Sequence, residues 1–183
     1  MDNLVPLYTS FTGRISRKTY WMGVIGIIIG AIVLSIILSL VGLGIMPNVA
    51  ALDPANPAAF AEAMNAATRS AAWGSLIMFV ILGVPSLAIA IKRRHDRNNS
   101  GNDVYVYFAL TLIMLLVQAF GFGYTTTEVN GISMPTPTVT MMILSAVIGI
   151  FAIYLLVVLG FLKGSDGANQ YGPDPLGGVA ATA

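Results

Sequence analysis

The stretch KRRHDRNNSGND at residues 92–103 separates two apolar halves of the chain and decides how the rest is arranged. It is rich in Asn, Gly and Asp, residues that favour turns. It also contains Lys92, Arg93, Arg94 and Arg97, and Lys and Arg hold the loops of membrane proteins on the cytoplasmic side. The stretch therefore predicts a cytoplasmic loop between two membrane spans.

The composition excludes an ordinary water-soluble domain. The chain is 56% hydrophobic and 9% charged, whereas soluble domains are about 25% charged. Its 183 residues correspond to one domain. A net charge of +1 favours neither a nucleic-acid partner nor an acidic substrate. Because cysteine is absent, a disulfide framework, a thiolate zinc site and a Cys nucleophile are excluded.

Long windows without charge predict a polytopic all-α membrane protein, since a span needs about 20 apolar residues. The four spans are expected at residues 20–43, 71–91, 104–123 and 138–162. The first is longer than the apolar core of a cleavable signal, which has about 7–15 residues, so we expect it to be retained. Pro85 lies inside the second span and should bend that helix.

The remaining segments complete the predicted domain, residues 1–175, and a disordered tail, residues 176–183. Residues 44–70 carry helix-start signals at Asp53-Pro54 and Asn56-Pro57. We expect a helix there, either a spacer that runs into the second span or a surface helix that covers a pore mouth or meets a partner. Residues 124–137 are expected to form an outer loop.

The distribution of cations predicts the orientation of the chain. If both termini and residues 92–103 share one side of the membrane, every Lys and Arg except Arg69 lies on that side. Positive charge marks the cytoplasmic side. Both termini are therefore expected in the cytoplasm (N-in/C-in), with residues 44–70 forming a helical periplasmic loop.

His95 and Asp96 are the strongest candidates for chemistry. An Asp can orient an imidazole for general-base catalysis, and adjacent His-Asp pairs occur in metal-dependent phosphohydrolases. Those sites need further His ligands, and this chain has one His. A structural loop His is thus favoured over catalysis. A metal site formed with Asp103 would have a weak ligand set, so no catalytic residue, metal or cofactor is predicted.

Two further patterns leave alternatives open. The cations of residues 92–97 either grip anionic lipid headgroups, at about 1 kcal/mol each, or simply determine topology. Gly23, Gly26 and Gly30 share one face of the first span and favour close packing within the bundle, with homo-oligomerisation as the alternative.

The predicted spans contain no Asp, Glu, Lys, Arg or His, which disfavours coupled transport. Gln118, the most polar side chain of the third span, either lines a neutral path or bonds between helices.

Three separated stretches carry a family resemblance. FTGRISRKTYW at residues 11–21, RRHDRNNSG at residues 93–101 and KGSDGANQYGPDP at residues 163–175 resemble the signatures of the bacterial inner-membrane family called domain of unknown function 805. The matching positions are Phe11, Gly13, Arg14, Arg17, Tyr20, Trp21, Arg93, His95, Asp96, Ser100, Gly101, Lys163, Gly164, Gly167, Asn169, Tyr171, Gly172, Pro173 and Pro175. The chain departs at Arg94, where an apolar residue is usual, at Asn98, where glycine is favoured, and at Asn102, where an aromatic is common. The resemblance implies a polytopic inner-membrane protein and no established activity.

The three signatures flank predicted spans at one depth, so we expect them to meet on the cytoplasmic face. The expected cluster consists of Arg14, Arg17, Arg93, His95, Asp96, Asn169 and Tyr171. Arg14 or Arg17 should pair with Asp96 or with tail carbonyls, because an Arg fork near the interface needs oxygen partners. The predicted function is a non-enzymatic envelope or scaffold protein that binds a partner or an anionic lipid headgroup at this face, with no nucleic-acid partner. The alternative is a transporter or channel for a small neutral or amphipathic solute.

Overall fold

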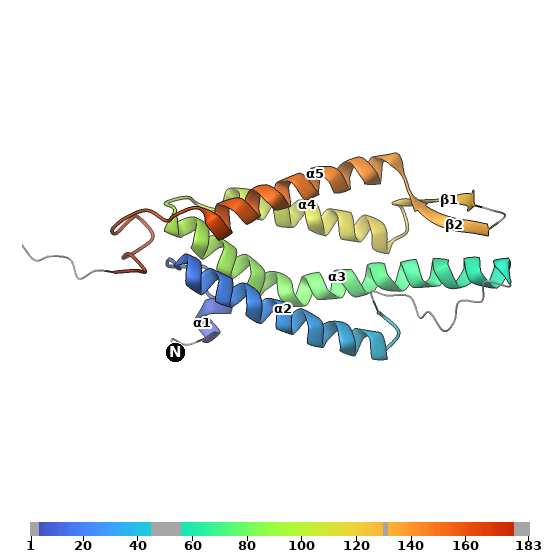
Figure 1. The fold of residues 1–183 in the computed structure, drawn as a ribbon, viewed down its shortest axis with the longest axis horizontal. Helices are drawn as coiled ribbons and strands as arrows, with labels where there is room; N and C mark the ends of the chain where they lie inside the picture. Colours follow the sequence, from blue (N-terminus) through green and yellow to red (C-terminus); the bar gives the residue numbers. More distant parts are fainter. Residues whose placement is uncertain (1–3, 45–55, 130–131, 178–183) are drawn as a thin grey trace, which may run out of the picture. The chain divides into compact units, whose positions relative to one another are not determined.

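The computed structural model describes residues 4–44, 56–129 and 132–177, and the described chain is mostly helical (Figure 1). Its elements, in order, are α1 (Leu4–Thr9), α2 (Arg17–Leu40), α3 (Pro57–Asp96), α4 (Asn102–Ala119), β1 (Tyr124–Val129), β2 (Ile132–Pro137), α5 (Val139–Leu156) and the π-helical turn η2 (Val157–Phe161).

Within the described residues, four helices are long and apolar enough to cross a membrane: Arg17–Leu40, Ala58–Asp96, Asn102–Ala119 and Val139–Phe161. Large apolar side chains stay exposed along them, as Ile25, Ile29 and Ile36 do on α2. A water-soluble protein rarely exposes so continuous an apolar surface. The prediction of four membrane-capable helices is confirmed.

The second of these helices is longer than predicted. α3 has 40 residues and begins at Pro57, whereas the span was expected from residue 71. The Asn56 Oδ1 atom accepts the Ala59 N–H at 3.2 Å and caps the helix. The segment before the span is thus a helix that runs directly into it, unbroken through Pro85. The other start signal, Asp53-Pro54, lies outside the described residues.

The segment expected to form an outer loop, residues 124–137, contains two strands, which the all-α prediction did not include. These residues form a β-hairpin in which Tyr124 pairs with Pro137 and Thr127 with Met134. The run Thr125, Thr126 and Thr127 favours extended structure because its side chains are β-branched. Proline is tolerated in β2 because each strand of a two-stranded sheet has a free edge.

The chain forms two compact units. We call the first, residues 1–30, 82–109 and 150–183, the signature unit, and the second, residues 31–81 and 110–149, the hairpin unit. Each of the four long helices contributes to both units. Of the predicted disordered tail, Leu176 and Gly177 form a turn on Asp174, and residues 178–183 lie outside the described residues.

The core of the signature unit includes Ile15, Ile91, Val104 and Leu155, with α1 packed against it through Leu7 and Tyr8. Side chains of α1 and α3 pack closely against the predicted glycine face of α2. A methyl group on Gly23 would lie 3.3 Å from Ile89, and one on Gly30 would lie 3.7 Å from Leu82. A methyl group on Gly26 would overlap the Tyr8 hydroxyl, which itself donates to the Gly23 carbonyl at 3.1 Å.

The hairpin unit is held mainly by apolar contacts. The rings of Trp73 and Phe120 meet edge to face with centroids 5.6 Å apart. Gly74 leaves room for the Leu43 carbonyl, and Gly123 leaves room for the side chain of Met141.

Candidate functional site

Asp96, the last residue of α3, is the centre of a buried cluster of charges. Its Oδ1 atom accepts from Arg14 Nε at 3.3 Å and from Arg14 Nη2 at 3.2 Å. Its Oδ2 atom accepts from Arg93 Nη1. The side chains of Arg14 and Arg93 are each 1% exposed and that of Asp96 is 5% exposed. Two buried guanidinium groups therefore share one carboxylate, and further oxygen atoms must satisfy their remaining donors.

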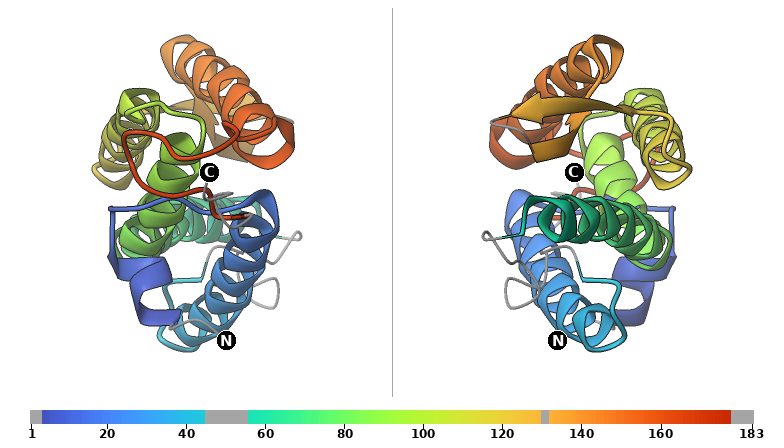
Figure 2. Two further views of the ribbon diagram at one scale, coloured as in Figure 1. Left: turned by 90° about the vertical axis from the view of Figure 1, so that its left-hand side faces the viewer. Right: turned by 90° about the vertical axis from the view of Figure 1, so that its right-hand side faces the viewer.

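The tail that follows η2 supplies the oxygens around Arg14. Arg14 Nη2 donates to the Ser165 carbonyl at 2.8 Å, and Nη1 donates to the carbonyls of Gly167 and Gly172 at 2.6 and 3.2 Å. A guanidinium has five donors in a rigid plane, so one side chain can join α3 to two turns of the tail. The tail, red in Figure 2 (left), crosses the end of the signature unit.

The end of η2 is capped by side chains from α2 and α3. Arg93 Nε donates to the Leu159 carbonyl at 2.9 Å, and Arg93 Nη2 donates to that of Leu162. Trp21 Nε1 donates to the Gly160 carbonyl at 3.1 Å, and Arg17 Nη1 donates to that of Phe161 at 3.2 Å. The last carbonyls of a helix lack partners within it and favour cations. Four consecutive carbonyls are satisfied in this way.

Glycines make room for these contacts. A methyl group on Gly160 would lie 2.7 Å from the Trp21 ring, and one on Gly164 would overlap the Asp96 carboxylate. The Ser165 N–H and hydroxyl then donate to the Asp96 carbonyl at 2.8 and 3.0 Å. The tail thus follows the surface of α3 at a distance that a side chain at position 164 would prevent.

His95, Asn169 and Tyr171 form a second layer. The His95 and Tyr171 rings stack with centroids 3.9 Å apart and an interplanar angle of 4°. His95 Nδ1 lies 3.2 Å from the Gly13 carbonyl oxygen. Asn169 Nδ2 donates to the His95 carbonyl at 3.0 Å, and Asn169 Oδ1 accepts the Tyr171 N–H at 2.9 Å. All seven residues of the expected cluster therefore lie in this one network.

The turn that ends the described tail is organised by Asp174. Its Oδ1 atom accepts the Leu176 N–H at 2.9 Å, and its Oδ2 atom accepts the Gly167 N–H at 3.1 Å. These hydrogen bonds stabilise the carboxylate, that from Leu176 most, and lower the pKa of Asp174 from its ordinary value.

Sequence reasoning missed the partners of Lys92 and Arg94. Lys92 is buried, and its Nζ atom donates to the carbonyls of Pro6 and Leu7 at 2.7 and 2.6 Å. It thereby caps α1, a helix that Leu4, Leu7 and Tyr8 could have indicated by their helical spacing. Arg94 pairs with Asp103 at 2.9 Å.

The candidates for catalysis and metal binding are engaged elsewhere. In the described part of the chain, Asp96 does not hydrogen-bond the His95 ring, because both of its oxygens are bound to arginines. Asp103 binds Arg94 and accepts from the Tyr154 hydroxyl at 3.1 Å. His95, Asp96 and Asp103 form no metal-holding group among the described residues.

The cluster is closed to ligands of ordinary size. Among the described residues, every buried side-chain nitrogen and oxygen atom has a hydrogen-bond partner. The cavity beside the cluster, lined by Arg17, Asp96 and Asp174 among others, has a volume of about 60 Å³. Ligand sites start at about 300 Å³, so this cavity suits water.

The four membrane-capable helices indicate a multi-pass membrane protein. Buried ion pairs and hydrogen bonds link the ends of these helices in the signature unit. The chain belongs to the family described as "Protein of unknown function (DUF805)", whose model matches residues 8–173. The resemblance noted from its three signatures is thereby confirmed. No curated protein and no solved structure matches the chain.

The central signature departs from the family pattern at Asn98, and the backbone explains the usual glycine. Asn98 has a φ of 54°, a left-handed conformation that glycine adopts without strain and asparagine tolerates better than most residues.

Proposed function

We propose that the protein is a non-enzymatic component of the bacterial inner membrane, with both termini and residues 92–103 in the cytoplasm, that binds anionic lipid headgroups at its cytoplasmic face. One observation carries this proposal. Among the cations near the three signatures, Arg14 and Arg93 form a buried set that is paired within the protein, and Arg17, Lys18 and Lys163 form an exposed set.

The buried set is better suited to structure than to binding. Arg14 and Arg93 would have to leave Asp96 and several carbonyls to reach a headgroup, and removing a partner from a buried ion pair costs about 3–5 kcal/mol. We assign this set to closing one end of the helix bundle, as a rigid support for the exposed cations.

The exposed set is suited to a lipid surface. Arg17 and Lys18 are exposed at the start of α2, and the side chain of Lys163, although it contacts Asp166, is 68% exposed. An exposed pair of this kind contributes little, so Lys163 can turn towards a phosphate at small cost. Each such cation contributes about 1 kcal/mol near an anionic leaflet.

The surroundings of His95 and Asp96 support a non-enzymatic role. The imidazole is stacked on Tyr171, and the carboxylate that would orient a general base is bound to Arg14 and Arg93. The Asp96 carboxylate could orient the imidazole as a general base only by leaving these two arginines.

The proposal is tested by native mass spectrometry of the protein from nanodiscs containing phosphatidylglycerol or phosphatidylcholine. We expect preferential retention of phosphatidylglycerol, reduced stepwise by Arg17→Gln, Lys18→Gln and Lys163→Gln. Arg69→Gln, which removes the exposed cation of α3 in the hairpin unit, is the matched control and should change nothing. Equal retention of the two lipids would refute the proposal.

The roles assigned to the two sets are separated by Arg14→Ala. This variant should unfold more easily while its folded fraction keeps the bound lipid. A stable but lipid-poor variant would make the cluster itself the headgroup site. A reporter fused after Ala183 that is active only in the periplasm would contradict the orientation.

A second candidate, a channel or transporter for a small polar solute, is favoured by one observation in the hairpin unit. Two cavities of about 320 and 230 Å³ share Thr68, Gln118 and Tyr124, and the larger is also lined by Asn65 and Arg69. Solute flux into proteoliposomes that Gln118→Leu abolishes would establish this function in place of the first.

A further inference from the structure

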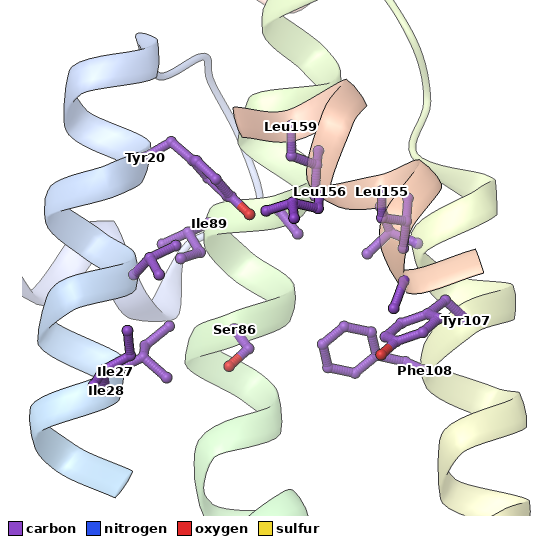
Figure 3. Close-up of a pocket in the computed structure, with 14 residues that line it drawn as sticks. Tyr20, Ile27, Ile28, Ser86, Ile89, Tyr107, Phe108, Leu155, Leu156 and Leu159 are labelled. Atoms are coloured by element: carbon purple, nitrogen blue, oxygen red, sulfur yellow. The ribbon is translucent and has the colours of Figure 1, made fainter. Parts of the chain in front are cut away.

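An apolar groove lies in the signature unit between α2, α3, α4 and the end of α5 (Figure 3). Its volume is about 300 Å³, at the lower limit of ligand sites, about 300–1,000 Å³. Ile27 and Ile89 line one side, and the rings of Tyr107 and Phe108 lie across from them.

The residues that line the groove are mostly apolar, and they favour a hydrocarbon ligand. None of the residues that line the groove is charged, and the Tyr20 hydroxyl and the Ser86 side chain are among its few polar groups, both directed towards the space in Figure 3. A polar solute would lose its hydration here with few hydrogen bonds in return. An apolar chain gains about 25 cal/mol for each Å² that it buries.

Hydrocarbon chains surround any helix that crosses a bilayer. An acyl chain is therefore the apolar occupant that the surroundings of this groove supply.

Exposed cations lie close in sequence to one end of the groove. Tyr20 and Leu159 belong to its lining, and Arg17 precedes Tyr20 by one turn of α2. The Arg17 guanidinium contacts the Phe161 carbonyl, and the exposed Lys163 follows two residues later. Tyr and Trp, here Tyr20 and Trp21, settle where hydrocarbon meets headgroups. The two features together match a molecule with an apolar chain and an anionic head.

We propose that this groove holds one hydrocarbon chain of a phospholipid, whose headgroup lies at Arg17 and Lys163. The anionic charge of the headgroup is inferred from the proposed function. The binding of the hydrocarbon chain is inferred from the groove itself. Tyr20 then marks the boundary between chain and headgroup.

The test uses phosphatidylglycerol and phosphatidylcholine that carry a diazirine within one acyl chain, incorporated into nanodiscs with the unaltered protein. After photolysis, mass spectrometry maps the labelled residues. We expect labels concentrated on groove residues such as Ile27, Ser86 and Leu156. Labels spread evenly along the exposed apolar faces of α2 and α5 would overturn the proposal.

A pair of variants gives an independent measurement. Ala152→Phe fills the groove, whereas Ala109→Phe places the same ring at an exposed position of α4 that does not line it. Ala152→Phe should lower groove labelling about tenfold, equivalent to 1.4 kcal/mol of binding, and Ala109→Phe should leave it unchanged. Because labels are counted on folded protein purified by size exclusion, loss of folding is not mistaken for loss of binding.

The two lipids separate this inference from the proposed function. Groove labelling that is equal for both lipids would support the seating of the chain and refute the anionic preference. Preferential retention of phosphatidylglycerol without groove labelling would support the anionic preference and refute the groove assignment.

Discussion

The signature unit and the hairpin unit are stabilised by different interactions. Every ion pair that the described residues form lies in the signature unit, three of them with little exposure: Arg14–Asp96, Arg93–Asp96 and Arg94–Asp103. In the hairpin unit, the described contacts include ring packing, close approach at glycines, the β1–β2 ladder and hydrogen bonds of uncharged side chains such as that of Ser145 to the Met141 carbonyl.

This difference indicates how each unit responds to change. Apolar contacts are non-directional and roughly proportional to buried area, so the hairpin unit should tolerate rearrangement. Buried charges require partners in a fixed geometry. Substitutions in the signature unit should therefore cost more stability than substitutions in the hairpin unit. The following experiments test that contrast.

The largest effect is expected for Asp96→Asn. The change removes the one carboxylate between two buried guanidinium groups, and breaking a buried pair costs about 3–5 kcal/mol. Reversible unfolding in mixed micelles, followed by circular dichroism, measures the free energy of unfolding. Asp166→Asn, at the exposed pair with Lys163, is the control and should unfold like the unaltered protein. Equal stability of both variants would mean that the cluster does not hold the unit together.

A glycine-to-alanine change should act with opposite sign in the two units. At Gly164 the added methyl group overlaps the Asp96 carboxylate, and overpacking of this kind costs about 1–3 kcal/mol. At Gly149, in the α5 part of the hairpin unit, the methyl group meets no atom within 4 Å. There alanine should stabilise the helix by about 0.5–1 kcal/mol. Thermal unfolding of both variants in one detergent is the measurement, and two shifts of the same sign would contradict the contrast.

A smaller effect is expected in the hairpin. The Thr127 and Thr136 hydroxyls hydrogen-bond across the strands at 2.7 Å on an exposed face, and such cross-strand pairs contribute about 0.2–1 kcal/mol. Thr127→Ala should accelerate amide exchange in β1 and β2 while leaving exchange around Asp96 unchanged. Thr126→Ala, on the neighbouring exposed position of β1, serves as the control.

The smallest effect is a local response to pH at Asp174. Because its folded pKa is lowered, the carboxylate stabilises the turn above its ordinary pKa, and this contribution is lost as the pH falls through the lowered folded pKa. Amide exchange at Gly167 and Leu176 should therefore accelerate on acidification before the helices unfold. Asp174→Asn should remove this pH dependence, and its persistence in that variant would assign it to another group.

The sequence alone determined the number of membrane-capable helices, because charge-free windows of span length report directly on solvation in hydrocarbon. It also identified the residues of the buried cluster through the three family signatures. The boundaries were less well predicted. α3 extends back to Pro57 because alanine-rich chain continues a helix without a break, and the hairpin was hidden in a short segment with no apolar alternation.

Only the tertiary structure decided which partners the charged residues take. Arg14 and the Ser165 carbonyl are separated by 151 positions, and Lys92 and Leu7 by 85. Sequence patterns report local periodicity and composition, whereas a buried cation takes whatever oxygens the packed chain brings within about 3 Å. For this reason three neighbouring cations of one predicted loop contact three different parts of the chain. Arg93 caps the end of η2, Arg94 pairs with Asp103, and Lys92 caps the last turn of α1.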